Sequence, residues 1–179
     1  SRLVLYDSVD GRIGQALRAE DVGPFMEWAQ GLLGPLPYGE ELRIVSAPTS
    51  WLGFEHPANI VLREDLGTQR EVYENPVLHT CMHEVFHQWA GNRTTIQSAM
   101  DFAWKEGIAE YLTYVYEEER RPPAESIKTR ASWARIALLA ALFPRPIPAE
   151  PASVPPLESL AVDSYGTGPM LLFLQLEPI

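Results

Sequence analysis

The stretch NPVLHTCMHEVFHQWAGN, residues 75–92, determines more about this chain than any other part of it. Asn75 is a good helix N-cap, and Pro76 suits the first helical position because it lacks the N–H group that would have no intrahelical partner there. The helix then places His83 and His87 one turn apart on the same face. Two imidazoles with this spacing can bind one metal ion, so the stretch predicts a metal-binding helix.

The pattern His83-Glu84-Val85-Phe86-His87, H-E-x-x-H, needs a third protein ligand, because a catalytic zinc ion takes three and leaves one position open. Glu106 is the candidate, since it lies in a predicted second helix and 18 residues separate it from His87, enough for an antiparallel return. Glu84 stays free to act as a general base. The alternative is that the pentapeptide arises by chance and its histidines are ordinary surface residues.

Three other residues near this pattern each allow a structural or a supporting role. Glu110 lies on the same helical face as Glu106, where it either orients a ligand histidine or is a solvated acid. His79 precedes His83 by one turn, but three histidines in line on one helix cannot surround a zinc ion tetrahedrally. We therefore interpret His79 as a packed or ligand-supporting residue, and Cys81 as a small buried residue.

Upstream of this helix, the sequence predicts one packing helix and a small sheet. Asp21 can cap a helix with apolar residues at helical spacing, and Gly34-Pro35 ends it. Two β-type runs follow, over residues 42–47 and 59–63, and an extended segment over residues 51–57 lies between them. The order is sheet first and helices after, which favours an α+β fold with a small mixed β-sheet.

The rest of the chain is predicted to be mainly helical. Helices are expected over residues 75–92, 100–119, 126–143 and 165–176. A proline-rich segment over residues 144–156 cannot be helical and is interpreted as a loop within the domain. A chain of 179 residues most simply forms a single domain, 1–179, with a β-rich part over about 1–72 and a helical part over about 73–179.

The composition excludes some classes of partner. The net charge is −10 and the pI is near 4.8, so phosphate backbones and anionic lipid would be repelled, and we expect no nucleic acid and no membrane insertion. No apolar run reaches the length of a membrane span. A single cysteine cannot form an internal disulfide, which leaves the compartment open, and a soluble, cytoplasmic protein is the default expectation.

At residues 83–92 the chain resembles the zinc aminopeptidases typified by membrane alanyl aminopeptidase and leukotriene hydrolase, which are gluzincins. Their pattern H-E-x-x-H-x-W-x-G-N is complete here. The family's next pattern is W-L-x-E-G-x-x-x-Y, of which Glu106, Gly107 and Tyr111 match, while Ala103-Trp104 stands where Trp-Leu is usual. The resemblance implies a thermolysin-like zinc peptidase catalytic domain with one bound zinc ion.

Two further segments extend the resemblance. Leu52-Gly53-Phe54-Glu55-His56 is similar to the family's G-A-M-E-N signature, which implies that Glu55 binds the α-ammonium of a substrate and that the backbone at Gly53 pairs with the peptide. Ser164-Tyr165-Gly166-Thr167-Gly168 is similar to Y-x-K-G, which implies that the Tyr165 hydroxyl stabilises the oxyanion. Without the resemblance, Glu55 would be an exposed acid and Tyr165 a core or turn residue.

These motifs together predict a zinc metallopeptidase that removes N-terminal residues from peptides with a free N-terminus. In the implied mechanism zinc activates water, Glu84 moves its proton to the leaving amine, and Glu55 restricts cleavage to the amino end. One alternative is a thermolysin-type endopeptidase, and another is a zinc-binding interaction domain with weak or no activity. The sequence covers only the catalytic domain of that family, so missing flanking domains are expected partners.

Overall fold

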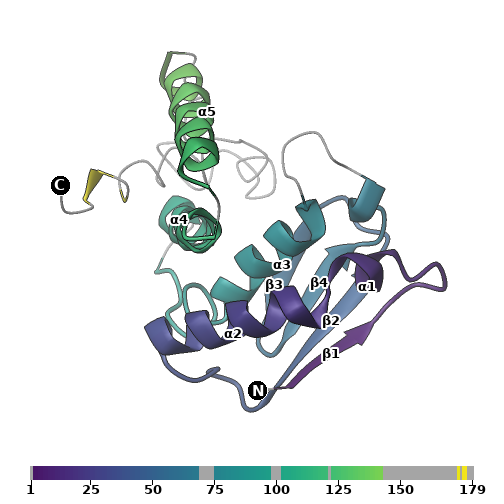
Figure 1. The fold of residues 1–179 in the computed structure, drawn as a ribbon. Helices are drawn as coiled ribbons and strands as arrows, with labels where there is room; N and C mark the ends of the chain where they lie inside the picture. The colour runs from purple at the N-terminus through teal and green to yellow at the C-terminus, as the bar shows by residue number, and fades with distance from the viewer. Residues whose placement is uncertain are drawn as a thin grey trace, which may run out of the picture. The chain divides into compact units, whose positions relative to one another are not determined.

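The computed structural model describes residues 2–68, 75–97, 102–120 and 122–142, together with Phe173, Gln175 and Leu176. The chain divides into two compact units, residues 1–95 (unit 1) and residues 96–179 (unit 2). Unit 1 contains a four-stranded sheet with helices, and the described part of unit 2 is helical (Figure 1). A mixed sheet combined with helices confirms the predicted α+β class.

Unit 1 is built on a sheet with the strand order β1-β2-β4-β3. The strands are β1 (Arg2–Tyr6), β2 (Glu41–Ala47), β3 (Gly53–His56) and β4 (Asn59–Arg63). β1, β2 and β4 are parallel, and β3 pairs antiparallel with β4, so that Glu55 lies opposite Ile60. The two predicted strands are thereby confirmed, and the predicted extended segment supplies the edge strand β3.

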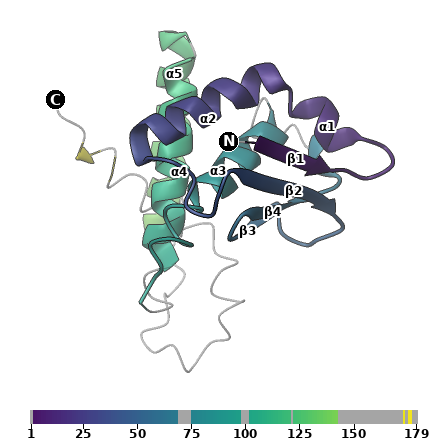
Figure 2. The same cartoon turned by 90° about the horizontal axis from the view of Figure 1, so that it is seen from below.

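Helices cover one face of this sheet (Figure 1, Figure 2). They are α1 (Arg12–Ala16), α2 (Ala19–Leu33), the short 3-10 helix η1 (Leu66–Thr68) and α3 (Pro76–Phe86). α3 packs on β3 and β4, and α2 packs on α3. The core between the layers consists of buried apolar side chains, among them Leu42, Ile44, Ile60 and Leu62 from the strands and Phe25, Val77, Val85 and Phe86 from the helices. This packing fixes α3 against the edge strand.

The start of α2 differs from the prediction. We expected Asp21 to be the N-cap, but the helix begins at Ala19, after Arg18, and no side chain caps it. Asp21 lies inside the first turn, where a carboxylate interacts favourably with the helix dipole, and its oxygen is 2.9 Å from Arg18 Nε. Asp21 therefore stabilises this helix by charge rather than by capping.

α3 begins where the sequence predicts but ends earlier. The Asn75 side chain accepts a backbone hydrogen bond at 3.0 Å, and Pro76 occupies the first helical position. The expected continuation to residues 91–92 is wrong, because regular helix stops at Phe86 and turns follow. Gly91, in these turns, has a φ of 137°, a conformation that favours glycine.

The described part of unit 2 consists chiefly of α4 (Phe102–Glu118) and α5 (Pro123–Leu142), which correspond to the helices predicted over residues 100–119 and 126–143. Among the described residues, no helix is long and apolar enough to cross a membrane.

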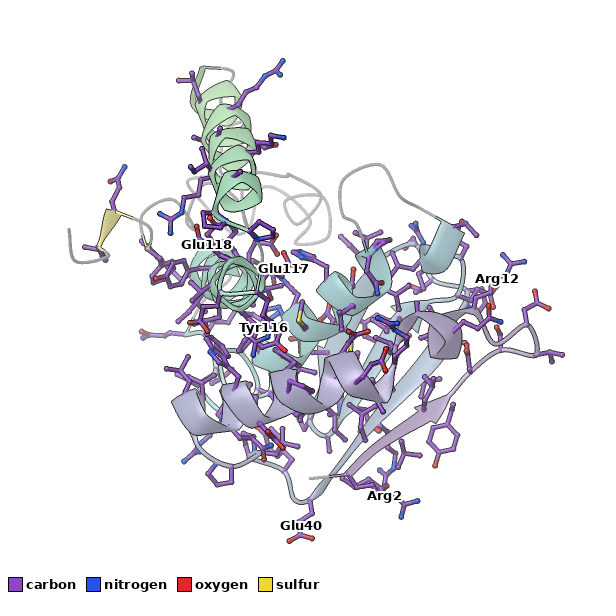
Figure 3. The ribbon with its side chains drawn as sticks, in the orientation of Figure 1. Arg2, Arg12, Glu40, Tyr116, Glu117 and Glu118 are labelled. Carbon is purple, nitrogen blue, oxygen red and sulfur yellow. The ribbon has the colours of Figure 1, made fainter. Side chains whose placement is uncertain are left out.

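A bidentate ion pair joins the two helices of unit 2. Glu118, labelled in Figure 3, lies at the end of α4. It accepts hydrogen bonds of 2.7 and 2.6 Å from Arg130 of α5. The predicted proline-rich segment over residues 144–156 lies outside the described residues, and of the helix predicted over residues 165–176 only three residues are described.

The two units divide between residues 95 and 96. The predicted β-rich part over about 1–72 and helical part over about 73–179 stay predictions. α1, α2 and α3 all pack in unit 1 with the sheet, because their apolar faces cover it. The helix that carries His83 and His87 therefore belongs to the same unit as the edge strand that carries Glu55 (Figure 2). A single catalytic domain over residues 1–179 stays a prediction.

Candidate metal centre

The two candidate ligand histidines converge at the C-terminal end of α3. His83 is in the last helical turn and His87 is the C-cap residue, so their side chains leave the helix one turn apart. Their Nε2 atoms are 3.0 Å apart, and their ring planes are inclined by 86° with the centroids 4.7 Å apart. The structure therefore brings these two imidazole nitrogens to one place.

The donor atoms of this pair fit a zinc ion. Two nitrogens separated by 3.0 Å can both lie about 2.0–2.1 Å from one point, the usual Zn–N distance. His87 Nδ1 is 3.0 Å from the Ala90 carbonyl oxygen, which accepts a hydrogen bond only from a protonated ring nitrogen. Neutral His87 therefore keeps its Nε2 lone pair for a metal, with its ring oriented by the backbone.

The turns after α3 hold His87 in place. The Asn92 N–H donates to the His87 carbonyl at 2.9 Å, and the Gly91 N–H donates to the Thr94 carbonyl at 3.0 Å. The chain reverses at Gly91, where a side chain would oppose the positive φ. Residues 88–92, which follow H-E-x-x-H, thus support His87. This support is a physical reason why these residues belong to the motif.

Glu84 is buried against the edge strand, with 6% of its surface exposed. A Cβ atom added to Gly53 of β3 would lie 2.8 Å from Glu84 Oε1 and 2.9 Å from Thr80 Cγ2. Such separations are shorter than non-bonded contacts allow, so a side chain at position 53 would displace the Glu84 carboxylate. Glycine at this position serves the close approach of strand and helix.

Glu55 lies in the same region of unit 1. One carboxylate oxygen of Glu55, one of Glu84 and one ring nitrogen of His87 lie within 4.8 Å of one another. Gly53 and Glu55 alternate along β3 with the exposed Phe54, so they share the face of the strand that looks toward α3. A cluster of acceptors like this can bind a metal ion or a substrate ammonium.

Two further polar residues of α3 are core residues. Burial raises the pKa of the Cys81 thiol to about 12, and the charge of Glu84 adds to the rise. The thiol is therefore protonated at neutral pH, which excludes it as a nucleophile. His79 is buried as well, and none of the groups of described residues that could share a metal ion contains it.

Gln88, which directly follows the second histidine, links the end of α3 to the turn between β3 and β4. The sequence analysis assigned no role to this residue. Its Oε1 accepts from the Ala58 N–H at 2.9 Å, and its Nε2 donates to the His56 carbonyl at 3.2 Å. Its position directly after His87 was the only signal in the sequence that could have found it.

The remaining predicted residues belong to unit 2. Glu106 lies on α4, where its Oε1 accepts a hydrogen bond of 2.9 Å from Lys105 Nζ. Glu110 is one turn further along α4 and is buried. Tyr165 lies outside the described residues. Ligation by Glu106 and oxyanion stabilisation by Tyr165 stay predictions.

The family comparison covers the segment that contains Glu55, the H-E-x-x-H pattern and Glu106. Residues 54–142 match the family model described as the peptidase family M1 domain. No curated protein matches the chain. The match extends from β3 through α5 and so includes the whole H-E-x-x-H helix.

Several solved structures are similar in fold. The M1 zinc metallopeptidase of Deinococcus radiodurans is 20% identical, with a TM-score of 0.61 over 89% of this chain and 34% of that one. A variant of it bound to a Tyr-Ser-Ala substrate is 18% identical, with a TM-score of 0.60 over 87% and 32%. A two-domain M1 zinc metallopeptidase variant bound to L-arginine is 21% identical, with a TM-score of 0.53 over 68% and 26%. The chain thus spans about a third or less of the length of these structures.

The fold, the helix with its two convergent histidines and the family match agree with one another. The structural likeness supports the arrangement of sheet and helices, and the family match covers the segment that carries His83, His87 and Glu106. The predicted resemblance is thereby confirmed: residues 54–142, just under half of this chain, match the peptidase family M1 domain.

Proposed function

We propose that this chain is the catalytic part of a zinc-dependent aminopeptidase. The observation that carries the proposal is the convergence, within unit 1, of the His83 and His87 Nε2 atoms, 3.0 Å apart, beside the carboxylates of Glu84 and Glu55. Two ligand nitrogens, a base and an acceptor for a cationic substrate are the groups that a metal-assisted exopeptidase needs. The match of residues 54–142 to the peptidase family M1 domain supports the same function.

One zinc ion would be held by His83, His87 and Glu106. The fit of the two imidazole nitrogens supports the first two ligands, and the spacing of 18 residues between His87 and Glu106 supports the third. Three protein ligands leave a position open for water or substrate. When bound, zinc would supply Lewis acidity to that water and to the scissile carbonyl.

Glu84 would be the general base. It lies between the two ligand histidines in sequence, and its burial against Gly53 restricts the carboxylate to one region. From there it would take a proton from the attacking water and deliver it to the leaving amine. The Tyr165 hydroxyl would donate a hydrogen bond to the oxyanion, as the family resemblance implies.

Glu55 would restrict cleavage to the amino end of the peptide. Its carboxylate lies near the groups that would react: one oxygen of Glu55, one oxygen of Glu84 and one ring nitrogen of His87 lie within 4.8 Å of one another. A substrate whose terminal ammonium binds Glu55 would therefore place the carbonyl of its first residue near the metal ion and Glu84. β3 is an edge strand, so the substrate backbone could pair with it at Gly53.

Metal analysis combined with paired substrates tests the proposal. The chain should contain one zinc ion, lose hydrolysis of aminoacyl arylamides on chelation and recover it when zinc is added back. The free-amine substrate should be hydrolysed about 100-fold faster than its N-acetylated form, because the acetylated form offers Glu55 no ammonium to bind. Equal hydrolysis of both forms would indicate an endopeptidase, and bound zinc without hydrolysis of any peptide would indicate a binding domain.

A further inference from the structure

We propose that Gln88 is a positioning residue that sets the distance between Glu55 and the metal-binding end of α3. The proposal rests on the aminopeptidase function proposed above, because Glu55 is the carboxylate that would bind the substrate ammonium. Gln88 acts through the turn that joins β3 to β4, and so it affects substrate placement rather than the chemical step.

The first observation is the bonding of the Gln88 amide. The side chain is buried, with 1% of the residue exposed, and both ends of its amide bond to backbone groups. Oε1 accepts from the Ala58 N–H at 2.9 Å, and Nε2 donates to the His56 carbonyl at 3.2 Å. These two groups flank Pro57 in the turn. Breaking either bond would leave one end of the buried Gln88 amide without its partner, so the amide holds the turn in one position.

The second observation is the backbone conformation of that turn. Ala58 has a φ of 58°, a left-handed conformation that alanine adopts rarely. Its N–H bonds to Gln88, and its carbonyl accepts from the Arg43 N–H of β2 at 3.0 Å. A conformation of this kind persists where the surrounding structure holds it from more than one side. Loss of the Gln88 amide would remove one of these two constraints.

The third observation is the short distance in sequence from the turn to the substrate-binding carboxylate. Glu55 directly precedes His56, whose carbonyl is bonded to Gln88, and Gln88 directly follows the ligand His87. β3 is a four-residue edge strand that pairs with β4 on one side. The amide therefore ties the strand that carries Glu55 to the residue next to a metal ligand.

A Gln88→Met substitution isolates this link, because methionine is similar in shape but cannot make either hydrogen bond. Gln30→Met is the matched control, since it removes a bond of 3.0 Å from a glutamine amide to the Met26 carbonyl on α2. Amide hydrogen exchange at Ala58 should become about 10-fold faster in Gln88→Met through local opening of the turn, and it should not change in Gln30→Met. Unchanged exchange at Ala58 in Gln88→Met would overturn the proposal.

The kinetic readout separates positioning from zinc binding. Gln88→Met should retain its zinc and raise KM for a free-amine arylamide about 10-fold, with kcat changed less than about threefold. In the double variant with Glu55→Gln, Gln88→Met should add little further loss, because both changes act on the same contact. Additive losses or loss of zinc would overturn the proposal. An inactive unsubstituted chain would instead overturn the proposed function, while Ala58 exchange would still decide whether Gln88 anchors the turn.

Discussion

α3 and α4 both carry candidate metal ligands, but they are stabilised in different ways. α3 has 11 residues, is capped by Asn75 and is buried along most of its length against the sheet and α2. α4 has 17 residues and carries ion pairs near both ends, Lys105 with Glu106 and Glu118 with Arg130. Because α3 is short and packed on several sides, the one-turn spacing of His83 and His87 in the sequence fixes where their side chains lie. On α4, Glu106 and Glu118 each have a cationic partner in the same unit, so the spacing of a carboxylate along this helix does not by itself identify what it binds.

The largest expected effect is that of Glu84→Gln on the chemistry at the end of α3. The variant should keep its zinc and its fold but lose about 10²–10⁴-fold in kcat, since the amide cannot accept the proton. Glu27→Gln, on the exposed side of α2, is the control and should retain full turnover. Arylamide hydrolysis with zinc analysis measures both, and near-normal turnover of Glu84→Gln would rule out its role as the base.

A core substitution tests whether packing holds α3 in place. Phe86 is fully buried, and its ring contacts those of Phe25 and Trp28 edge to face, with centroids 5.4 and 6.1 Å away. Phe86→Ala should lower the free energy of unfolding by about 3–5 kcal/mol through lost burial and the cavity left behind. The exposed Phe54→Ala should cost much less. Urea denaturation compares the two, and equal losses would contradict the packing account.

For α4 the corresponding test concerns zinc affinity. Removing a group that only supports a zinc ligand lowers zinc affinity by about 10- to 100-fold. Glu106→Gln removes a proposed ligand itself, so it should weaken zinc binding by at least as much. Glu110→Gln is the matched change one turn away, and it should have the smaller effect. Competition with a chromogenic chelator measures both affinities. If Glu110→Gln released zinc more readily than Glu106→Gln, the third ligand would have to be reassigned.

The smallest effect is the contribution of the ion pair between α4 and α5. Hydrogen bonds from Arg130, with a smaller effect of Tyr114, hold the pKa of Glu118 below its ordinary value of 4.5. A lowered pKa in the folded state means stabilisation that is present above the ordinary pKa and is lost as the pH falls through the folded value. The pair is partly exposed, so Arg130→Met should cost less than about 1 kcal/mol at pH 7.

Urea denaturation of this variant and the unsubstituted chain at pH 7 and pH 3 measures that difference. The gap in unfolding free energy should be smaller at pH 3 than at pH 7, because the contribution of the pair is lost as the pH falls through the pKa of Glu118 in the folded state. A gap that is the same at both pH values would show that Arg130 acts by packing alone, without its charge.

Several elements could be predicted because their causes are local. The Asn75 cap, the proline after it and the one-turn spacing of His83 and His87 depend on residues within a few positions of each other. The strands β2 and β4 followed from runs of β-forming residues. The end of α3 was predicted wrongly although its cause is also local, because the turn hydrogen bonds of residues 87–94 compete with helix continuation and the apolar pattern alone does not distinguish the two.

The sequence by itself determined that two imidazoles lie one turn apart on a capped helix, with a glutamate between them, because a helix repeats every 3.6 residues whatever surrounds it. Only the tertiary structure decided that Gly53 and Glu55 face that helix and that Gln88 bonds to the turn beside them. Gln88 and Ala58 are 30 residues apart in the chain. The pattern of neighbouring residues cannot predict such a contact, because the contact forms only when the strand and the helix pack together.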